Sequence, residues 1–247
     1  MAKEYVVSSV SFRSLFDALG EDEQVFIVQL TRLLNEINIL QKGVLYTTNC
    51  SERLEVPQQT ARRVQVMFLL RELASKLWEG WQILQKSYFG AALSKRYTDG
   101  LSQDAAAALK CIKDYFQRPG NPLKKIRDKH GSHYDASVIR DQLGRIPPDD
   151  RMPVFLAEDR GNCVFVFAED LAAVSVQESF GQKSEASMNR LVGEVAVEVP
   201  GWFQVFATHI LLTLIRREEP LRSEYTIEEL PTLSQVQFPF FVRPDPD

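Results

Sequence analysis

The sequence predicts a mainly α-helical protein, built as a helical bundle with a small β-hairpin insertion and an extended C-terminal arm. Three observations lead to this prediction. Apolar residues recur every three or four positions over long stretches, as on the buried face of a helix. Two short β-branched and aromatic runs follow one another between 154 and 167, and the chain beyond Glu218 contains five prolines with little helical period. We therefore expect one domain over 1–247, with a bundle core in 20–145, the hairpin and further helices in 150–217, and a tail over 218–247.

The first half of the chain contains three expected helices. The first has a regular apolar face, and Gly43 is a plausible stop. Pro57 opens the second at a position where its missing N–H costs nothing. Ser102 provides a side-chain oxygen that can cap the third. These helices are expected over 21–43, 57–88 and 102–116, with a looser connection over 91–102.

In the second half of the chain, the helical pattern is interrupted more often. Pro119 and Pro122 separate the third helix from a basic segment that begins near Leu123 and continues to about Leu143. The hairpin is expected to join 154–158 to 163–167 through a turn at 159–162. Helical periodicity then returns over 171–176 and over 184–217, the latter interrupted around Pro200 and Gly201.

Composition limits the kinds of partner. The chain has 247 residues, 45% hydrophobic and 25% charged, with a formal net charge of −4 and a pI of about 5.6. This excludes a protein coated with basic surface, so any contact with nucleic acid has to be local. Such a patch exists between Lys110 and His130, which contains seven Lys or Arg residues against two acids. A solvated helix face would show the same lysines.

Cysteine usage and apolar runs bear on location. Cys50, Cys111 and Cys163 are far apart, so neither a zinc site nor a disulfide framework is suggested, and a reducing cytoplasm fits. The N-terminal residues lack the pattern of a secretion signal. The longest apolar run, 202–215, contains polar residues and is more simply a buried helix. We expect a cytoplasmic protein without a membrane span and without a cofactor.

The most informative motif is Arg127-Asp128 followed after four residues by His133. Arg has a planar fork of donors that suits phosphate, and the pKa of His lies near neutrality, so the two can hold an anion and move a proton. The motif and its place after long helices resemble the Arg-polar-x4-His motif of the HEPN superfamily. The stretch 77–81 looks like that of abortive-infection AbiU-type members, and the resemblance covers roughly 20–145.

This resemblance implies a HEPN-like bundle and a metal-independent endoribonuclease of toxin or phage-defence type. His133 would be the general acid or base and Arg127 the phosphate clamp. Asp128 stands where the family usually has a polar residue, often Asn, that orients the other two. Positions six apart on an ideal helix differ in direction by about 240°, so something must bring Arg127 and His133 together. The family's two-fold dimer does so; we therefore expect a homodimer, RNA as partner, and a protein antitoxin or inhibitor.

Further residues of the segment are candidates for contacts with RNA. His130 and His133 could instead share a metal, but no third ligand is evident, so we expect no metal site. Tyr134 could stack on a base or pack against the bundle. Glu79, on an apolar helix, could support the site through Arg127 or Lys76, or simply reach solvent. The RNA-binding candidates are Lys124, Lys125, Lys129, His130 and Tyr134.

Two other functions fit the same sequence. A non-catalytic HEPN-like module could hold RNA or a nucleotide, and Asp128 favours it because a carboxylate can neutralise Arg127 and repel RNA. A structural or interaction protein would leave the basic segment in solvent and use the arm after Glu218 to wrap a partner. His209 lies among apolar residues and is expected to be a hydrogen-bonded core histidine without a site role.

Overall fold

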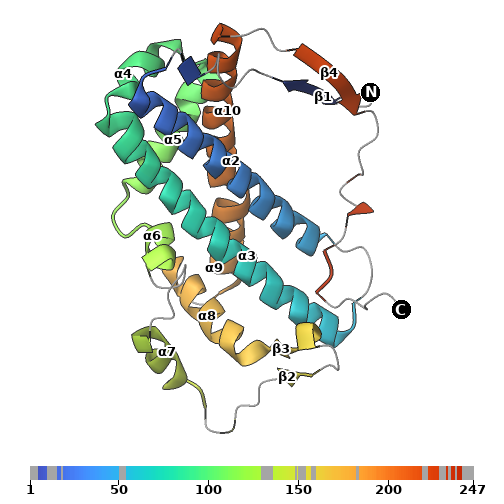
Figure 1. Ribbon diagram of the computed structural model, residues 1–247. Helices are drawn as coiled ribbons and strands as arrows, with labels where there is room; N and C mark the ends of the chain where they lie inside the picture. Colours follow the sequence, from blue (N-terminus) through green and yellow to red (C-terminus); the bar gives the residue numbers. More distant parts are fainter. Residues whose placement is uncertain are drawn as a thin grey trace.

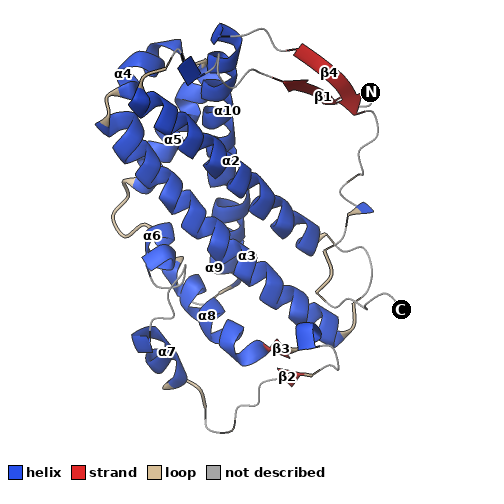
Figure 2. Cartoon of the chain, viewed as in Figure 1, coloured by secondary structure: helices blue, strands red, loops and turns tan. Residues whose placement is uncertain are grey.

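The computed structural model is mainly helical, as the sequence predicts (Figures 1 and 2). Two long helices cross the molecule and the other helices pack around them. The structure describes residues 5–9, 16–17, 19–49, 54–128, 136–147, 149, 154–156, 160–181, 184–218, 222–227, 232, 235–236 and 238–240.

The two long helices are α2 (Glu21–Thr48) and α3 (Val56–Ile83). Each buries a row of apolar side chains against the other. Helix α3 begins with a reciprocal capping box between Glu55 and Gln58, and a proline follows in its first turn. It ends in a π-helical turn, η1 (Leu84–Gly90), in which Tyr88 is fully buried.

Helix α2 does not stop at Gly43, contrary to the prediction; it continues for five more residues to Thr48. The reason is tertiary packing. A Cβ at Gly43 would lie 3.4 Å from the Leu69 side chain of α3, so this glycine lies at an ordinary contact with the neighbouring helix. Packing outweighs the modest cost of a glycine inside a helix.

Gly80 of α3 lies against side chains of two other helices. A Cβ there would lie 2.7 Å from Cδ2 of Leu33 on α2 and 3.0 Å from Cε1 of Phe203 on α10. Both neighbours are buried. Three helices therefore meet at a point where a side chain fits only if Leu33 or Phe203 shifts.

Helix α10 (Val199–Glu218) follows α9 (Glu185–Val192) and a π-helical turn, η5 (Gly193–Glu198). The chain is helical without a break from Glu185 to Ile215, and the interruption predicted around Pro200 and Gly201 takes the form of the π-helical turn η5 just before them. The Ala196 carbonyl, four residues before Pro200, instead accepts a hydrogen bond of 2.8 Å from Gln41 of α2.

Two short elements link η1 to the next long helix. They are α4 (Leu93–Tyr97) and the 3₁₀ turn η2 (Thr98–Gly100), in the region predicted as a looser connection. Arg96 and Tyr97 both bond the carboxylate of Glu23, which is buried at the start of α2. The connection is thereby fixed to the bundle.

Helix α5 (Gln103–Phe116) matches its prediction, and the Ser102 hydroxyl accepts from the Ala105 N–H at 3.3 Å. It packs along α10. His209 of α10 is half-buried beside the start of this helix, with Nε2 3.1 Å from the Gly100 carbonyl oxygen. It is hydrogen-bonded as predicted, although at the margin of the core rather than inside it.

The predicted basic helix over 123–143 is described in two pieces, α6 (Pro122–Ile126) and α7 (Ala136–Leu143). The hairpin exists, but its strands are only two residues each: β2 (Val154–Phe155) and β3 (Val164–Phe165). Val166 and Phe167 were predicted as strand and instead begin helix α8 (Val166–Ser179). Val166 is fully buried in a small cluster with Ala61 and Val164, which ties the hairpin to α3.

A second pair of strands joins the two ends of the described chain. Strand β1 (Tyr5–Ser9) runs antiparallel to β4 (Arg222–Ile227), and in Figure 1 this ribbon stands apart from the helices. The segment after Glu218 was predicted as an extended arm, and β4 is extended. Its pairing with β1 was not predicted, because it joins segments more than 200 residues apart.

Gly80→Ala should destabilise the protein by about 1–2 kcal/mol. Alanine favours helix by up to about 1 kcal/mol, but an added methyl group against Leu33 and Phe203 costs about 1–3 kcal/mol. Urea unfolding measures the difference. Gly201→Ala on α10 is the control, because a Cβ there meets nothing within 4 Å and should leave stability unchanged or raised. Equal stability of the two variants would contradict the three-helix contact.

Candidate functional site

The candidate site is the exposed end of α6 and the turn before it. Asn121 holds this turn: its Nδ2 donates to the Tyr115 carbonyl at 2.9 Å, and its Oδ1 accepts from the N–H groups of Leu123 and Lys124 at 2.9 and 3.3 Å. Asn121 is 4% exposed, and Leu123 and Ile126 are fully buried. Gly120 has φ +69°, which glycine adopts without strain. The end of α5 and the start of α6 are thus rigidly joined.

The charged residues of α6 and of the two positions after it are exposed to solvent. Lys124 Nζ lies 2.7 Å from Oδ2 of Asp128, and Arg127 Nη1 lies 3.2 Å from Oδ1 of the same carboxylate. The three side chains are 58%, 44% and 37% exposed. The hydrogen bond from Lys124, with a weaker one from Arg127, lowers the pKa of Asp128 below its ordinary value. Asp128 therefore stays ionised at neutral pH and shares its charge between two cations.

The structure thus brings together three of the predicted site residues: Lys124, Arg127 and Asp128. Lys125 is exposed beside them, and no ion pair to it is present within the described ranges. The predicted catalytic His133 and the RNA-binding candidates Lys129, His130 and Tyr134 lie outside the described residues. Their contribution to the site stays a prediction.

A pocket of about 310 Å³ opens next to these residues. Its floor is aromatic: Trp78 of α3 and Phe116 of α5 are 8% and 4% exposed, with ring centroids 5.8 Å apart. Its rim is charged. The lining residues are Trp78, Phe116, Arg118, Gly120, Asn121, Lys124, Lys125 and Asp128.

Sequence reasoning did not find Trp78, Phe116, Arg118 or Asn121 as site residues. The sequence pattern at Trp78 and Phe116 predicts ordinary aromatic residues of the core, and both are indeed buried. The available signal was the Pro119-Gly120-Asn121-Pro122 turn. Such a turn brings the end of one helix close to the start of the next, and with it the side chains of both.

Glu79 is not part of this site. Its carboxylate lies 3.0 Å from Lys76 Nζ, which also lies 3.2 Å from Glu36 of α2. Of the two partners predicted for Glu79, the structure shows Lys76. The Glu79 side chain is 44% exposed, so it reaches solvent at the edge of the apolar face.

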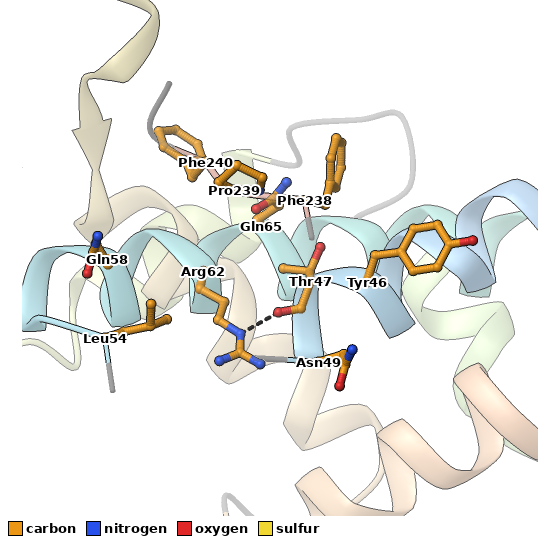
Figure 3. A pocket seen from close by; sticks show the side chains of 10 residues that line it. All are labelled: Tyr46, Thr47, Asn49, Leu54, Gln58, Arg62, Gln65, Phe238, Pro239 and Phe240. Atoms are coloured by element: carbon orange, nitrogen blue, oxygen red, sulfur yellow. Dashed lines mark hydrogen bonds between the residues drawn. The ribbon is translucent and has the colours of Figure 1, made fainter. Parts of the chain in front are cut away.

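A second pocket, of about 90 Å³, lies where α2 ends and α3 begins (Figure 3). Arg62 donates to the carbonyl oxygens of Thr47 and Thr48 and so caps the end of α2. Phe238 and Phe240 lie over the pocket, and Gln65 points toward this segment. Gln65 Oε1 is buried without a hydrogen-bond donor among the residues that the structure describes. With Arg62 occupied by the backbone, this pocket offers little chemistry.

Two further features bear on metal binding and on location. Within the described ranges, no group of three or more His, Cys, Asp or Glu residues could hold a metal. The helical run Glu185–Ile215 is long and apolar enough to cross a membrane, and 44% of its most apolar window is buried inside the protein. Core helices have the same composition, so location stays a prediction.

No family model, curated protein or solved structure matches this chain. The resemblance to HEPN proteins therefore rests on the Arg127-x5-His133 motif and its setting after long helices. The mainly helical fold is consistent with that setting and does not distinguish it from other helical bundles.

Asn121→Ala should lower stability by about 1–2 kcal/mol, because it removes a helix cap and leaves the Tyr115 carbonyl with backbone donors only, such as the Arg118 N–H at 3.4 Å. Amide hydrogen exchange at Leu123 and Lys124 should also rise. Asn189→Ala, at an exposed position of α9, is the control and should change neither the stability nor the amide exchange at Leu123 and Lys124. An unchanged exchange rate in Asn121→Ala would show that the turn is held by other contacts.

Proposed function

We propose that this protein binds RNA at the exposed end of α6 and cleaves it without a metal. The observation that carries the proposal is the placement of Arg127. Its guanidinium is exposed at the end of a short, rigidly anchored helix, with Lys124 beside it and Lys125 on the same pocket rim. Several cations at one edge of an acidic protein form the local patch that contact with a phosphate backbone requires.

The chemistry follows from the residue types. The 2′-hydroxyl of a ribose attacks the adjacent phosphate: an O2′–P bond forms, the P–O5′ bond breaks, and the products are a 2′,3′-cyclic phosphate and a 5′-hydroxyl. One group removes the proton from the 2′-hydroxyl and another protonates the leaving oxygen. His133 would perform one of these transfers. Its copy in a homodimer would perform the other, and Arg127 would stabilise the charge that builds on the phosphate oxygens.

Asp128 supports a second candidate, a module that binds RNA without cleaving it. The Asp128 carboxylate occupies Arg127 and Lys124, the two groups that would otherwise face a phosphate. An exposed ion pair of this kind is worth only about 0.2–1 kcal/mol, so a phosphate can displace it. RNA binding is therefore compatible with Asp128. Cleavage is less so, because the same carboxylate weakens the hold of Arg127 on the phosphate in the transition state.

Purified protein should cleave a mixed cellular RNA pool in EDTA, and His133→Ala should reduce the rate by about 100-fold or more, the usual contribution of a general acid or base. Arg127→Ala should reduce both binding and cleavage. His209→Gln is the control, since His209 bonds the Gly100 turn and has no role in the proposed site. RNA binding without cleavage by the native protein would favour the second candidate. Absence of both would overturn the proposal.

Asp128→Asn should raise the affinity for RNA by about two- to fivefold, because it frees Arg127 and Lys124 from an exposed ion pair. Fluorescence anisotropy with a labelled RNA at fixed salt measures the change. Asp114→Asn, at an exposed position of α5, makes the same change in net charge without touching Arg127. If the two variants gain equally, the effect is one of net charge and Asp128 does not restrain the clamp.

A further inference from the structure

The pocket beside α6 is built from two chemically different parts. Its floor is formed by the remaining exposed edges of Trp78 and Phe116. Phe116 is fixed from behind, because its ring stacks on Trp81 with centroids 5.6 Å apart and planes 9° apart. The floor therefore offers fixed aromatic edges rather than an open ring face, and a flat group would meet these edges without a rearrangement of the rings.

The rim carries the charge. Arg118, Lys124 and Lys125 contribute three cations, and Asp128 contributes one carboxylate. Lys124 is paired with Asp128. No carboxylate pairs with Lys125 or Arg118 in the described part of the chain, and the Arg118 guanidinium lies 5.3 Å from the centre of the Tyr115 ring. Two cations are thus available to an anion at the mouth of the pocket.

We infer that this pocket takes one unstacked nucleobase of single-stranded RNA, while Lys125 and Arg118, the two rim cations without a carboxylate partner in the described part of the chain, contact the phosphates on either side of it. This inference rests on the proposed function and names its substrate class. A nucleotide has the same two parts as the pocket: a flat base that packs on aromatic side chains, and a charged phosphate that seeks Lys and Arg. A volume of about 310 Å³ is at the lower end of the range for small-molecule sites, which suits one base rather than several.

Single-stranded RNA fits better than a duplex for a geometric reason. Bases in an A-form helix are stacked and paired, so none can enter a pocket unless it is first turned out of the helix. The pocket also lies next to Arg127, because Asp128 both lines it and pairs with that guanidinium. A base held there would place a neighbouring phosphate beside the proposed clamp.

Three RNA ligands of equal length test the inference on the native protein: a single-stranded octauridine, an abasic ribose-phosphate octamer and a double-stranded RNA. The single strand should bind about two- to tenfold more tightly than the abasic chain, since an edge-on contact between a flat ring and an aromatic side chain contributes about that factor. It should also quench tryptophan fluorescence, and Trp78→Phe should remove most of the quenching while keeping an aromatic ring at the floor.

Lys125→Gln should weaken binding of the single strand and of the abasic chain alike, because it removes a phosphate contact. Lys42→Gln, at an exposed position of α2 away from the pocket, is the matched control. Thermal unfolding checks that each variant is folded.

The possible failures are distinguishable. If none of the three ligands binds, the proposed function itself fails. If the single strand and the abasic chain bind equally without quenching, RNA is held by its phosphates alone and the base pocket is wrong, although RNA binding stands. Tighter binding of the duplex would also overturn the base pocket. So would preference for a phosphotyrosine peptide over RNA, which would assign the aromatic floor and cationic rim to a protein ligand.

Discussion

The close contact of three helices at Gly80 sets the positions of the other elements. Leu33 of α2 and Phe203 of α10 both pack against α3 at this residue, so side chains of two helices meet the third at one position. Interiors are packed at nearly crystalline density, and such a contact has little freedom to shift. Helix α5 packs along α10, and Asn121 ties the end of α5 to α6. The candidate site is thereby positioned from the centre of the bundle outward.

The same side chains connect the core to the pocket. Phe203, which meets Gly80, packs against Phe116 with ring centroids 6.0 Å apart, and Phe116 forms the pocket floor with Trp78. One layer of aromatic rings therefore serves as core on its inner side and as pocket wall on its outer side. A substitution at Gly80 would displace Phe203 and, through it, Phe116. The shape of the pocket therefore depends on the packing of the whole bundle and not on α6 alone.

Sequence patterns predicted the features that depend on local chemistry. Periodicity placed the long helices, and Ser102 caps α5 as expected. The errors come from contacts between segments far apart in the sequence. Gly43 meets Leu69 of α3 and does not end its helix, and Gln41 satisfies the carbonyl of Ala196 before Pro200. At the site, the charged residues of α6 were recognised by type, whereas Trp78 and Phe116 were not, because a core aromatic and a pocket aromatic have the same sequence pattern.

Asp128 decides what kind of phosphate site α6 can form. With its lowered pKa it remains ionised, so Lys124 and Arg127 face a fixed negative charge at neutral pH. Because all three side chains are substantially exposed, water and salt screen the pairs and their strength is small. A phosphate diester brings oxygens on two sides and can engage Arg127 and Lys124 together, whereas Asp128 must divide one carboxylate between them. In the proposed site, the carboxylate would therefore lower the affinity for a single phosphate more than the affinity for a polyanion that contacts several cations at once.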